Sequence, residues 1–240
     1  MNLKYICMHV WLIGVKPIKT LYMYMISNIA YPLSLLFAVG VLSDGKLLPF
    51  ALSGGLVALT AANTLVIAGE IAVFRLQNRY QDLIVSTNAG PIDYMIGETI
   101  AGISWAIPGI AFYFAMDLVY GILNPYRIVM TLFVSALLII SLASIAFVMA
   151  SRVKYVRNIW AISGILSILL MTISPTFYPY TYIPKYVLFA LSIIPTTPAA
   201  VLEQGIFGIA PIAWYMLPIL IVECIIYVMI AKWFIRWRED

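Results

Sequence analysis

Long apolar runs free of charged side chains alternate with short polar segments along the chain. A helix needs about 20 such residues to cross the hydrocarbon core of a bilayer, so runs of this length predict membrane-spanning helices. The runs are Thr20–Ser43, Leu47–Gly69, Thr99–Met116, Ile128–Ser151, Asn158–Pro184 and Gln204–Val222. A further apolar run, Tyr186–Leu202, is interrupted by Pro195-Thr-Thr-Pro198. The pattern predicts an all-α integral membrane protein with one transmembrane domain, residues 1–240.

The placement of Lys and Arg decides whether the interrupted run also spans. With six spans and a cytoplasmic N-terminus, only Lys46, Arg127 and Lys185 of the 14 basic residues fall outside the cell. The others fall inside: Lys4, Lys16, Lys19, Arg75, Arg79, Arg152, Lys154, Arg157, Lys232, Arg236 and Arg238. A seventh span would move the C-terminal basic residues outside, against the usual bias of Lys and Arg toward cytoplasmic loops. We therefore predict six spans in the cell (plasma) membrane with both termini cytoplasmic.

Composition supports a membrane protein and excludes several other classes. Hydrophobic residues make up 64% of the chain and charged residues 10%, whereas soluble domains carry about 25% charged residues. The mean hydropathy is +1.02. Cys7 and Cys224 lie far apart without a Cys-x-x-Cys or ligand cluster, so neither a disulfide framework nor a metal site is indicated. The net charge of +4 gives no reason to expect a nucleic-acid partner, and we expect no cofactor.

Two polar or amphipathic segments lie outside the predicted spans. In residues 1–19, Leu3, Ile6, Val10 and Ile13 recur at helical spacing, with Lys4 and His9 elsewhere on the helix. This predicts an interfacial helix on the cytoplasmic face, and the absence of an A-x-A-like site predicts that no signal peptide is removed. The second segment, residues 75–91, is polar up to Asp82, then apolar at Leu83-Ile84-Val85. It predicts a short helix parallel to the membrane, with Leu83-Ile84 on the bilayer and Pro91 starting the next element.

Small and polar residues inside the spans allow two interpretations. Gly54, Ala58 and Ala62 form a ridge along the second span that permits close approach of another helix. Polar side chains lie at similar depth in the second and fifth spans: Thr60, Asn63, Thr64, Asn158, Ser163 and Ser167. One interpretation is helix packing with local hydrogen bonds. The other is a substrate pathway at a subunit interface, and we retain these residues as its candidates.

The segment Glu70–Gly102, EIAVFRLQNRYQDLIVSTNAGPIDYMIGETIAG, resembles a segment of the membrane-spanning permease subunits of type-2 ABC transporters. Leu83-Ile84 stand at the paired-Leu position, Gly90-Pro91-Ile92-Asp93 at the Pro-Ile-Ser position, and Gly97-Glu98 at the Gly-Lys position. A second match is independent of the first. Ser174–Pro184 and Pro195-Thr-Thr-Pro198 with Glu203 resemble the Pro-rich turns on the outer side of these permeases, where short re-entrant helices form between the fifth and sixth spans.

Physical reasoning agrees with short outer helices. Lys185–Ile194 and Pro198–Phe207 are too short to cross, and irregular backbone at membrane depth needs protein or water around it. The resemblance implies a re-entrant outer segment over residues 175–208. It also implies an ATP-driven exporter subunit that forms the substrate pathway as a dimer with an identical or homologous second permease subunit, surrounded by membrane lipid.

The resemblance also implies ATPase partners, because the chain lacks the Gly-x-x-x-x-Gly-Lys-Ser/Thr loop that binds ATP phosphates. The chain itself is therefore not expected to be an enzyme, and ATP hydrolysis is expected in separate ABC ATPase subunits. The residues expected to transmit ATPase closure to the spans lie in the coupling segment, residues 75–91. They are Arg75, Gln77, Asn78, Arg79, Tyr80, Gln81 and Asp82.

Other function classes compete with this interpretation. An ion-coupled secondary transporter could use Glu223, Asp117 and the broken outer segment, and a non-transport membrane assembly protein is also possible. A membrane hydrolase is disfavoured because His9 is the single histidine and the acids are scattered. Glu70 and Glu98 are expected to pair with Arg75 or Arg79. Pro108-Gly109 is expected to kink the third span.

Overall fold

The computed structural model describes residues 2–122 and 124–234, and every regular element within them is a helix. The helices are α1 (Leu3–His9), η1 (Val10–Val15), η2 (Lys16–Lys19), α2 (Tyr22–Leu42), α3 (Leu48–Leu76), α4 (Tyr80–Val85), α5 (Pro91–Ser104), α6 (Ile107–Val119), α7 (Pro125–Arg152), α8 (Val156–Ile173), η3 (Tyr180–Tyr182), α9 (Lys185–Leu191), α10 (Thr196–Ile206) and α11 (Met216–Phe234). This confirms the all-α prediction for the described chain.

Within the described residues, 4 helices are long and apolar enough to cross a membrane by themselves: α3, α7, α8 and α11. A fifth candidate is the pair α5 and α6, which is bent by 52°. Helix α2 contributes a shorter apolar stretch, Ile26–Leu42. These lengths and compositions identify a membrane protein with several spanning helices, as the apolar runs predict.

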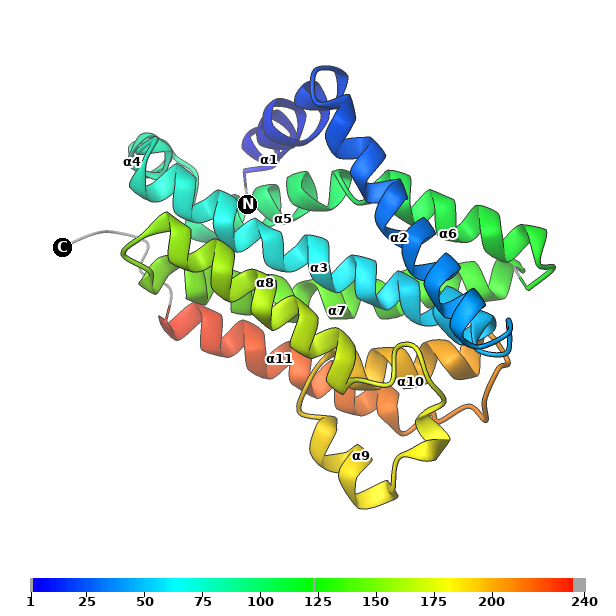
Figure 1. Ribbon diagram of the computed structural model, residues 1–240. Coiled ribbons are helices and arrows are strands. Elements are labelled where there is room, and N and C mark those ends of the chain that lie inside the picture. Colours follow the sequence, from blue (N-terminus) through cyan, green and yellow to red (C-terminus); the bar gives the residue numbers. More distant parts are fainter. Residues whose placement is uncertain (1, 123, 235–240) are drawn as a thin grey trace.

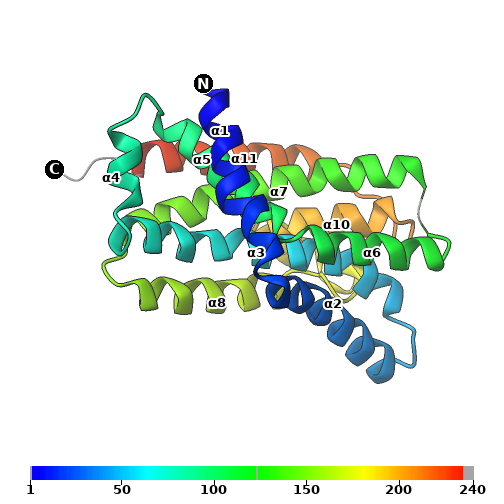
Figure 2. The same ribbon diagram turned by 90° about the horizontal axis from the view of Figure 1, so that it is seen from above.

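Helix α3 lies at the centre of the bundle (Figures 1 and 2) and packs against α2, α5, α6, α7, α8 and α10. In its most apolar stretch 78% of the residues are buried inside the protein, against 22% in α11. Small residues allow this close packing. A Cβ atom on Gly54 would lie 1.5 Å from the carbonyl oxygen of Thr176, so only glycine fits there. The predicted small-residue ridge thus packs against segments of the same chain at Gly54.

The long helices run side by side, which gives the bundle two ends (Figure 1). We call one the α4 end, where α3, α7 and α11 finish and α8 begins; the connections between α2 and α3 and between α6 and α7 lie at the opposite end. Helix α1 crosses the direction of the long helices (Figure 2) and packs on α5. The basic residues at or next to helix ends on the α4 side are Arg75, Arg79, Arg152, Lys154, Arg157 and Lys232. Lys46 and Arg127 lie at the opposite end.

Several predicted boundaries are wrong, for identifiable reasons. The last span begins at Met216 and continues to Phe234, whereas the apolar run ends at Val222. The run ends there because of Glu223, but that side chain is only 7% exposed, so the helix continues through it. Gln204, the expected start, instead lies in α10, where its amide donates to the carbonyl oxygens of Pro175 (2.6 Å) and Tyr178 (2.9 Å).

Two other boundaries depend on proline. Helix α8 ends at Ile173, before Ser174-Pro175, and not at Pro184 as the apolar run suggests. The residue before a proline avoids the helical conformation for steric reasons, so α8 ends before Ser174-Pro175. The expected break in the third span is present, but it lies between Ser104 and Ile107. Pro108 stands in the first turn of α6, a position that a helix tolerates well.

The segment between α8 and α11 contains the two short helices predicted from the sequence. Helix α9 covers Lys185–Leu191, and helix α10 covers Thr196–Ile206. Helix α10 packs against α3, α7 and α11, and nearly all of its side chains are buried. At its start, the Thr196 and Thr197 hydroxyls lie 2.6 Å and 3.0 Å from the Ser174 hydroxyl. The short helix is therefore part of the protein core.

Candidate functional site

The connection between α3 and α5 forms the predicted short helix, but with a different start. Helix α3 continues to Leu76, so Arg75 belongs to it, and α4 begins at Tyr80. Between them, Arg79 adopts a left-handed backbone conformation with φ of 48°. Such a residue reverses the chain after a helix. The turn orients α4 independently of α3, which a continuous polar helix from Arg75 would not allow.

Helix α4 has an exposed side and a buried side. Gln77, Asn78 and Arg79, in the turn before α4, and Asp82 of α4 are exposed, and we call these four residues the α4 surface. Tyr80 is half-buried and Gln81 is buried. The expectation that Leu83 and Ile84 both face the bilayer is wrong, because Leu83 is 64% exposed but Ile84 only 3%.

A buried pair between His9 and Glu98 lies beneath α4. The His9 Nε2 and Glu98 Oε2 atoms are 2.5 Å apart, and both side chains are 0% exposed. The Tyr5 hydroxyl lies 3.3 Å from His9 Nδ1. The Tyr80 ring stacks on the His9 ring with centroids 6.0 Å apart. One imidazole thus connects α1, α4 and α5.

The pair corrects two expectations from the sequence. Glu98 contacts His9 and not the arginines Arg75 or Arg79. His9 is buried, although the sequence places it off the apolar stripe of the predicted interfacial helix. A single histidine in a mostly apolar segment is a signal in itself, because burying a polar ring requires a hydrogen-bonding partner. The pairing with Glu98 across 89 positions has no local signature.

The tyrosines around His9 keep their protons at neutral pH. Burial raises the pKa of Tyr80, and the nearby Glu98 carboxylate raises it further. Burial also raises the pKa of Tyr5, with smaller contributions from Tyr80 and Glu98. Their hydroxyls therefore remain available as hydrogen-bond donors beside the imidazole.

Arg75, a predicted coupling residue, makes contacts inside the chain. Its Nη1 donates to the Ala150 carbonyl at 2.7 Å, and its Nη2 donates to the Val153 carbonyl at 3.3 Å. These carbonyls lie at the end of α7, where backbone acceptors lack partners within the helix. Arg75 therefore connects the end of α3 to the end of α7 at the α4 end of the bundle.

The predicted pathway residues of α3 make local hydrogen bonds. Thr60, Asn63 and Thr64 are at most 8% exposed. The Thr64 hydroxyl donates to the Thr60 carbonyl at 2.7 Å, and the Asn63 amide donates to the Leu59 carbonyl at 3.0 Å. These contacts match the interpretation of helix packing with local hydrogen bonds.

The predicted pathway residues of α8 lie in two places. The Ser167 hydroxyl donates to the Ser163 carbonyl at 2.8 Å. The Ser163 hydroxyl is buried and has no hydrogen-bond partner among the described residues. Asn158 is exposed near the start of α8. The structure therefore does not gather the six pathway candidates into one cavity of the described chain.

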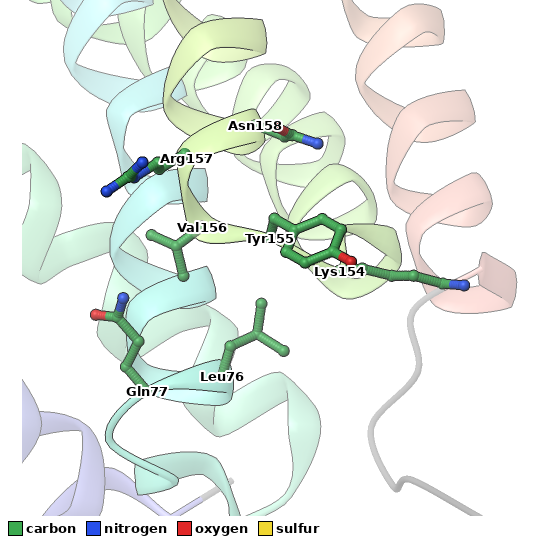
Figure 3. A pocket seen from close by; sticks show the side chains of 7 residues that line it. All are labelled: Leu76, Gln77, Lys154, Tyr155, Val156, Arg157 and Asn158. Carbon is green, nitrogen blue, oxygen red and sulfur yellow. The ribbon is translucent and has the colours of Figure 1, made fainter.

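An open depression of about 720 Å³ lies between the end of α3 and the start of α8 (Figure 3). Its lining residues are Leu76, Gln77, Lys154, Tyr155, Val156, Arg157 and Asn158. It contains one predicted coupling residue, Gln77, and one predicted pathway residue, Asn158. Sequence reasoning counted Lys154 and Arg157 only as topological signals, because the approach of α3 to α8 is a tertiary feature.

Buried carboxyl groups lie in three other helices. Glu203 of α10 is 0% exposed and accepts a hydrogen bond from the Thr131 hydroxyl at 2.8 Å. Asp117 and Glu223 are also buried, and their carboxyl oxygens accept no hydrogen bond from any described residue. Across the described chain, no group of 3 or more His, Cys, Asp or Glu residues could hold a metal ion.

Neither the known protein families nor the curated proteins contain a match to this chain.

Proposed function

We propose that this chain is the membrane subunit of an ATP-driven exporter of the type-2 ABC class. In this proposal α2, α3, the α5–α6 pair, α7, α8 and α11 are the six spans. Helices α9 and α10 form the outer re-entrant segment, and both termini are cytoplasmic. The subunit works in the cell membrane as a dimer with a second permease subunit, and separate subunits hydrolyse ATP.

The observation that carries the proposal is the supported α4 surface. A polar surface on the turn and short helix between two candidate spans suits the contact with a moving partner. Its underside is held by Ile84, which is 3% exposed, and by the Tyr80–His9 stack above Glu98. Because α1 and α5 share this support, a displacement of α4 would move them together, as a rigid-body switch requires.

The distribution of charge supports the orientation. The basic residues at the ends of α3, α7, α8 and α11 gather at the α4 end of the bundle. Lys and Arg concentrate in cytoplasmic loops of membrane proteins. This orientation places the α4 surface on the side of the membrane where ATP is available.

The test is the purification of the chain in mild detergent with its phosphate-loop ATPase, followed by measurement of ATP hydrolysis. Arg79 and Asp82 are exposed on the α4 surface, and the double variant Arg79→Ala/Asp82→Ala removes one positive and one negative charge. A loss of roughly 1–4 kcal/mol of association energy is expected if these residues are anchors of the interface. Stimulated ATP hydrolysis should fall in parallel.

A matched control is available in the connection between α2 and α3, at the end of the bundle opposite α4. Asp44→Ala/Lys46→Ala also removes one charge of each sign from exposed positions, and Asp44, like Arg79, has a positive φ, of 50°. This variant should co-purify and stimulate hydrolysis like the wild type. Full association and full hydrolysis with the Arg79→Ala/Asp82→Ala variant would refute the α4 surface as the ATPase contact.

The buried carboxyl groups favour a second candidate, an ion-coupled secondary transporter. Ionisable residues inside membrane segments often belong to proton or ion pathways. Asp117 and Glu203 are each 0% exposed. If this candidate holds, proteoliposomes with the chain alone should show solute movement driven by a pH gradient without ATP. Asp117→Asn and Glu203→Gln should abolish it.

A further inference from the structure

The depression beside α3 and α8 lies at a membrane boundary whichever way the protein is oriented. Its lining residues Lys154 and Tyr155 belong to the short connection between α7, which ends at Arg152, and α8, which begins at Val156. Both helices are long and apolar enough to span. A connection between two consecutive spans must lie at the level of the lipid headgroups.

The lining chemistry suits an anion. Lys154 and Arg157 are exposed, and Gln77 and Asn158 add amide groups that can donate hydrogen bonds. No acidic residue lines the depression. Neither Lys154 nor Arg157 forms an ion pair with an acid of the described chain. Figure 3 shows the Arg157 and Lys154 side chains at the rim of the depression, extending in opposite directions.

The remaining walls suit a lipid better than a free anion. Leu76 and Val156 line the depression with apolar groups, and Tyr155 is 69% exposed at headgroup level, as interfacial tyrosines are. Farther along α8, Ile165, Ile168 and Leu169 are 61%, 62% and 46% exposed. They offer an apolar surface for acyl chains, whereas a soluble phosphate would leave it unused.

We propose that this depression binds the headgroup of an anionic phospholipid, with Lys154 and Arg157 supplying the positive charge that attracts it. Basic pockets between spanning helices bind anionic headgroups in this way. The inference requires only that α7 and α8 span the membrane, so it is independent of the proposed transport function.

The experiment measures lipid binding to the detergent-purified chain by native mass spectrometry. Dioleoyl phosphatidylglycerol, dioleoyl phosphatidylcholine and inorganic phosphate are titrated separately. Phosphatidylglycerol should bind with clear preference over phosphatidylcholine. Lys154→Gln/Arg157→Gln should weaken phosphatidylglycerol binding about 25-fold, or about 5-fold for each charge removed near the membrane surface. Arg157→Lys should retain most of the binding, because it keeps the charge.

The matched control is Lys46→Gln/Lys185→Gln, which removes the same charge from exposed positions outside the depression. It should bind phosphatidylglycerol like the wild type. Equal losses in both double variants would indicate general attraction to the membrane and overturn the site. Competition by inorganic phosphate at the lipid's own concentration would also overturn it. Unchanged lipid binding with loss of ATPase capture in Lys154→Gln/Arg157→Gln would assign the depression to a protein partner instead.

Discussion

At the scale of single residues, the His9–Glu98 pair offers a test of how α1 is attached. Both side chains are 0% exposed, and the pair atoms are 2.5 Å apart. Removing one member of a buried, hydrogen-bonded pair costs about 1–3 kcal/mol, because the other polar group is left without its partner. Glu98→Leu should therefore lower the unfolding temperature and expose α1 to protease. His9→Leu/Glu98→Leu should recover much of the stability, because an apolar pair leaves no buried polar group without a partner.

The readouts are the thermal unfolding midpoint in detergent and the rate of proteolysis within residues 3–19. Additive losses in the double variant would contradict the assignment of a direct pair, since residues in contact show a coupling energy.

Gly54 and Gly164 form a matched pair of glycines inside spanning helices. A Cβ on Gly54 would overlap the Thr176 carbonyl at 1.5 Å, whereas a Cβ on Gly164 would meet nothing within 4 Å. Overpacking a core position costs about 1–3 kcal/mol, so Gly54→Ala should destabilise the protein. Gly164→Ala should be neutral or stabilising by about 1 kcal/mol, from helix propensity. Equal unfolding midpoints for the two variants would show that α3 does not pack against the Thr176 segment.

At the scale of elements, Arg75 supplies hydrogen-bond donors to the free backbone carbonyls at the end of α7. It donates to the carbonyls of Ala150 and Val153, and hydrogen bonds to charged groups contribute about 1.5–3 kcal/mol. Arg75→Met should lower stability by that amount and increase hydrogen exchange at the end of α7. Arg152→Met is the control, because Arg152 is exposed and donates a longer 3.3 Å bond to Phe234. A similar effect of both changes would mean that Arg75 acts only through its charge.

The elements also show which features the sequence could predict. Helices α7, α9 and α10 begin and end within a few residues of the predicted limits, because apolar length and proline placement are local signals. The end of α11 at Phe234 was missed because the burial of Glu223, 7% exposed, is a tertiary effect. The polar character of the α4 surface could be predicted, because polar residues between two apolar runs are visible in the sequence. The support of this surface by His9 could not be predicted, because His9 lies far in the sequence from both Tyr80 and Glu98, 89 positions from the latter.

At the scale of the whole molecule, α3 determines the architecture. Because α3 is buried on all sides, it combines small residues with Thr60, Asn63 and Thr64, a set in which the Asn63 and Thr64 side chains donate to backbone carbonyls of the same helix. Polar groups at this depth without water must bond within the helix or to neighbours. This explains why a composition that suggests a pathway can also belong to the core of a single subunit. A pathway shared with a second subunit would then involve more peripheral helices such as α8.

The orientation of the bundle can be tested directly. Single cysteines are introduced into a Cys7→Ser background, because Cys7 is exposed and Cys224 is buried. Asn78→Cys and Lys154→Cys mark the α4 end, and Lys46→Cys and Thr181→Cys mark exposed positions outside it. A membrane-impermeant maleimide should label the second pair in intact cells and the first pair only after permeabilisation, because Lys and Arg concentrate in cytoplasmic loops. Labelling of Asn78→Cys in intact cells would invert the orientation. The α4 surface would then face away from ATP, and the exporter proposal would fail with it.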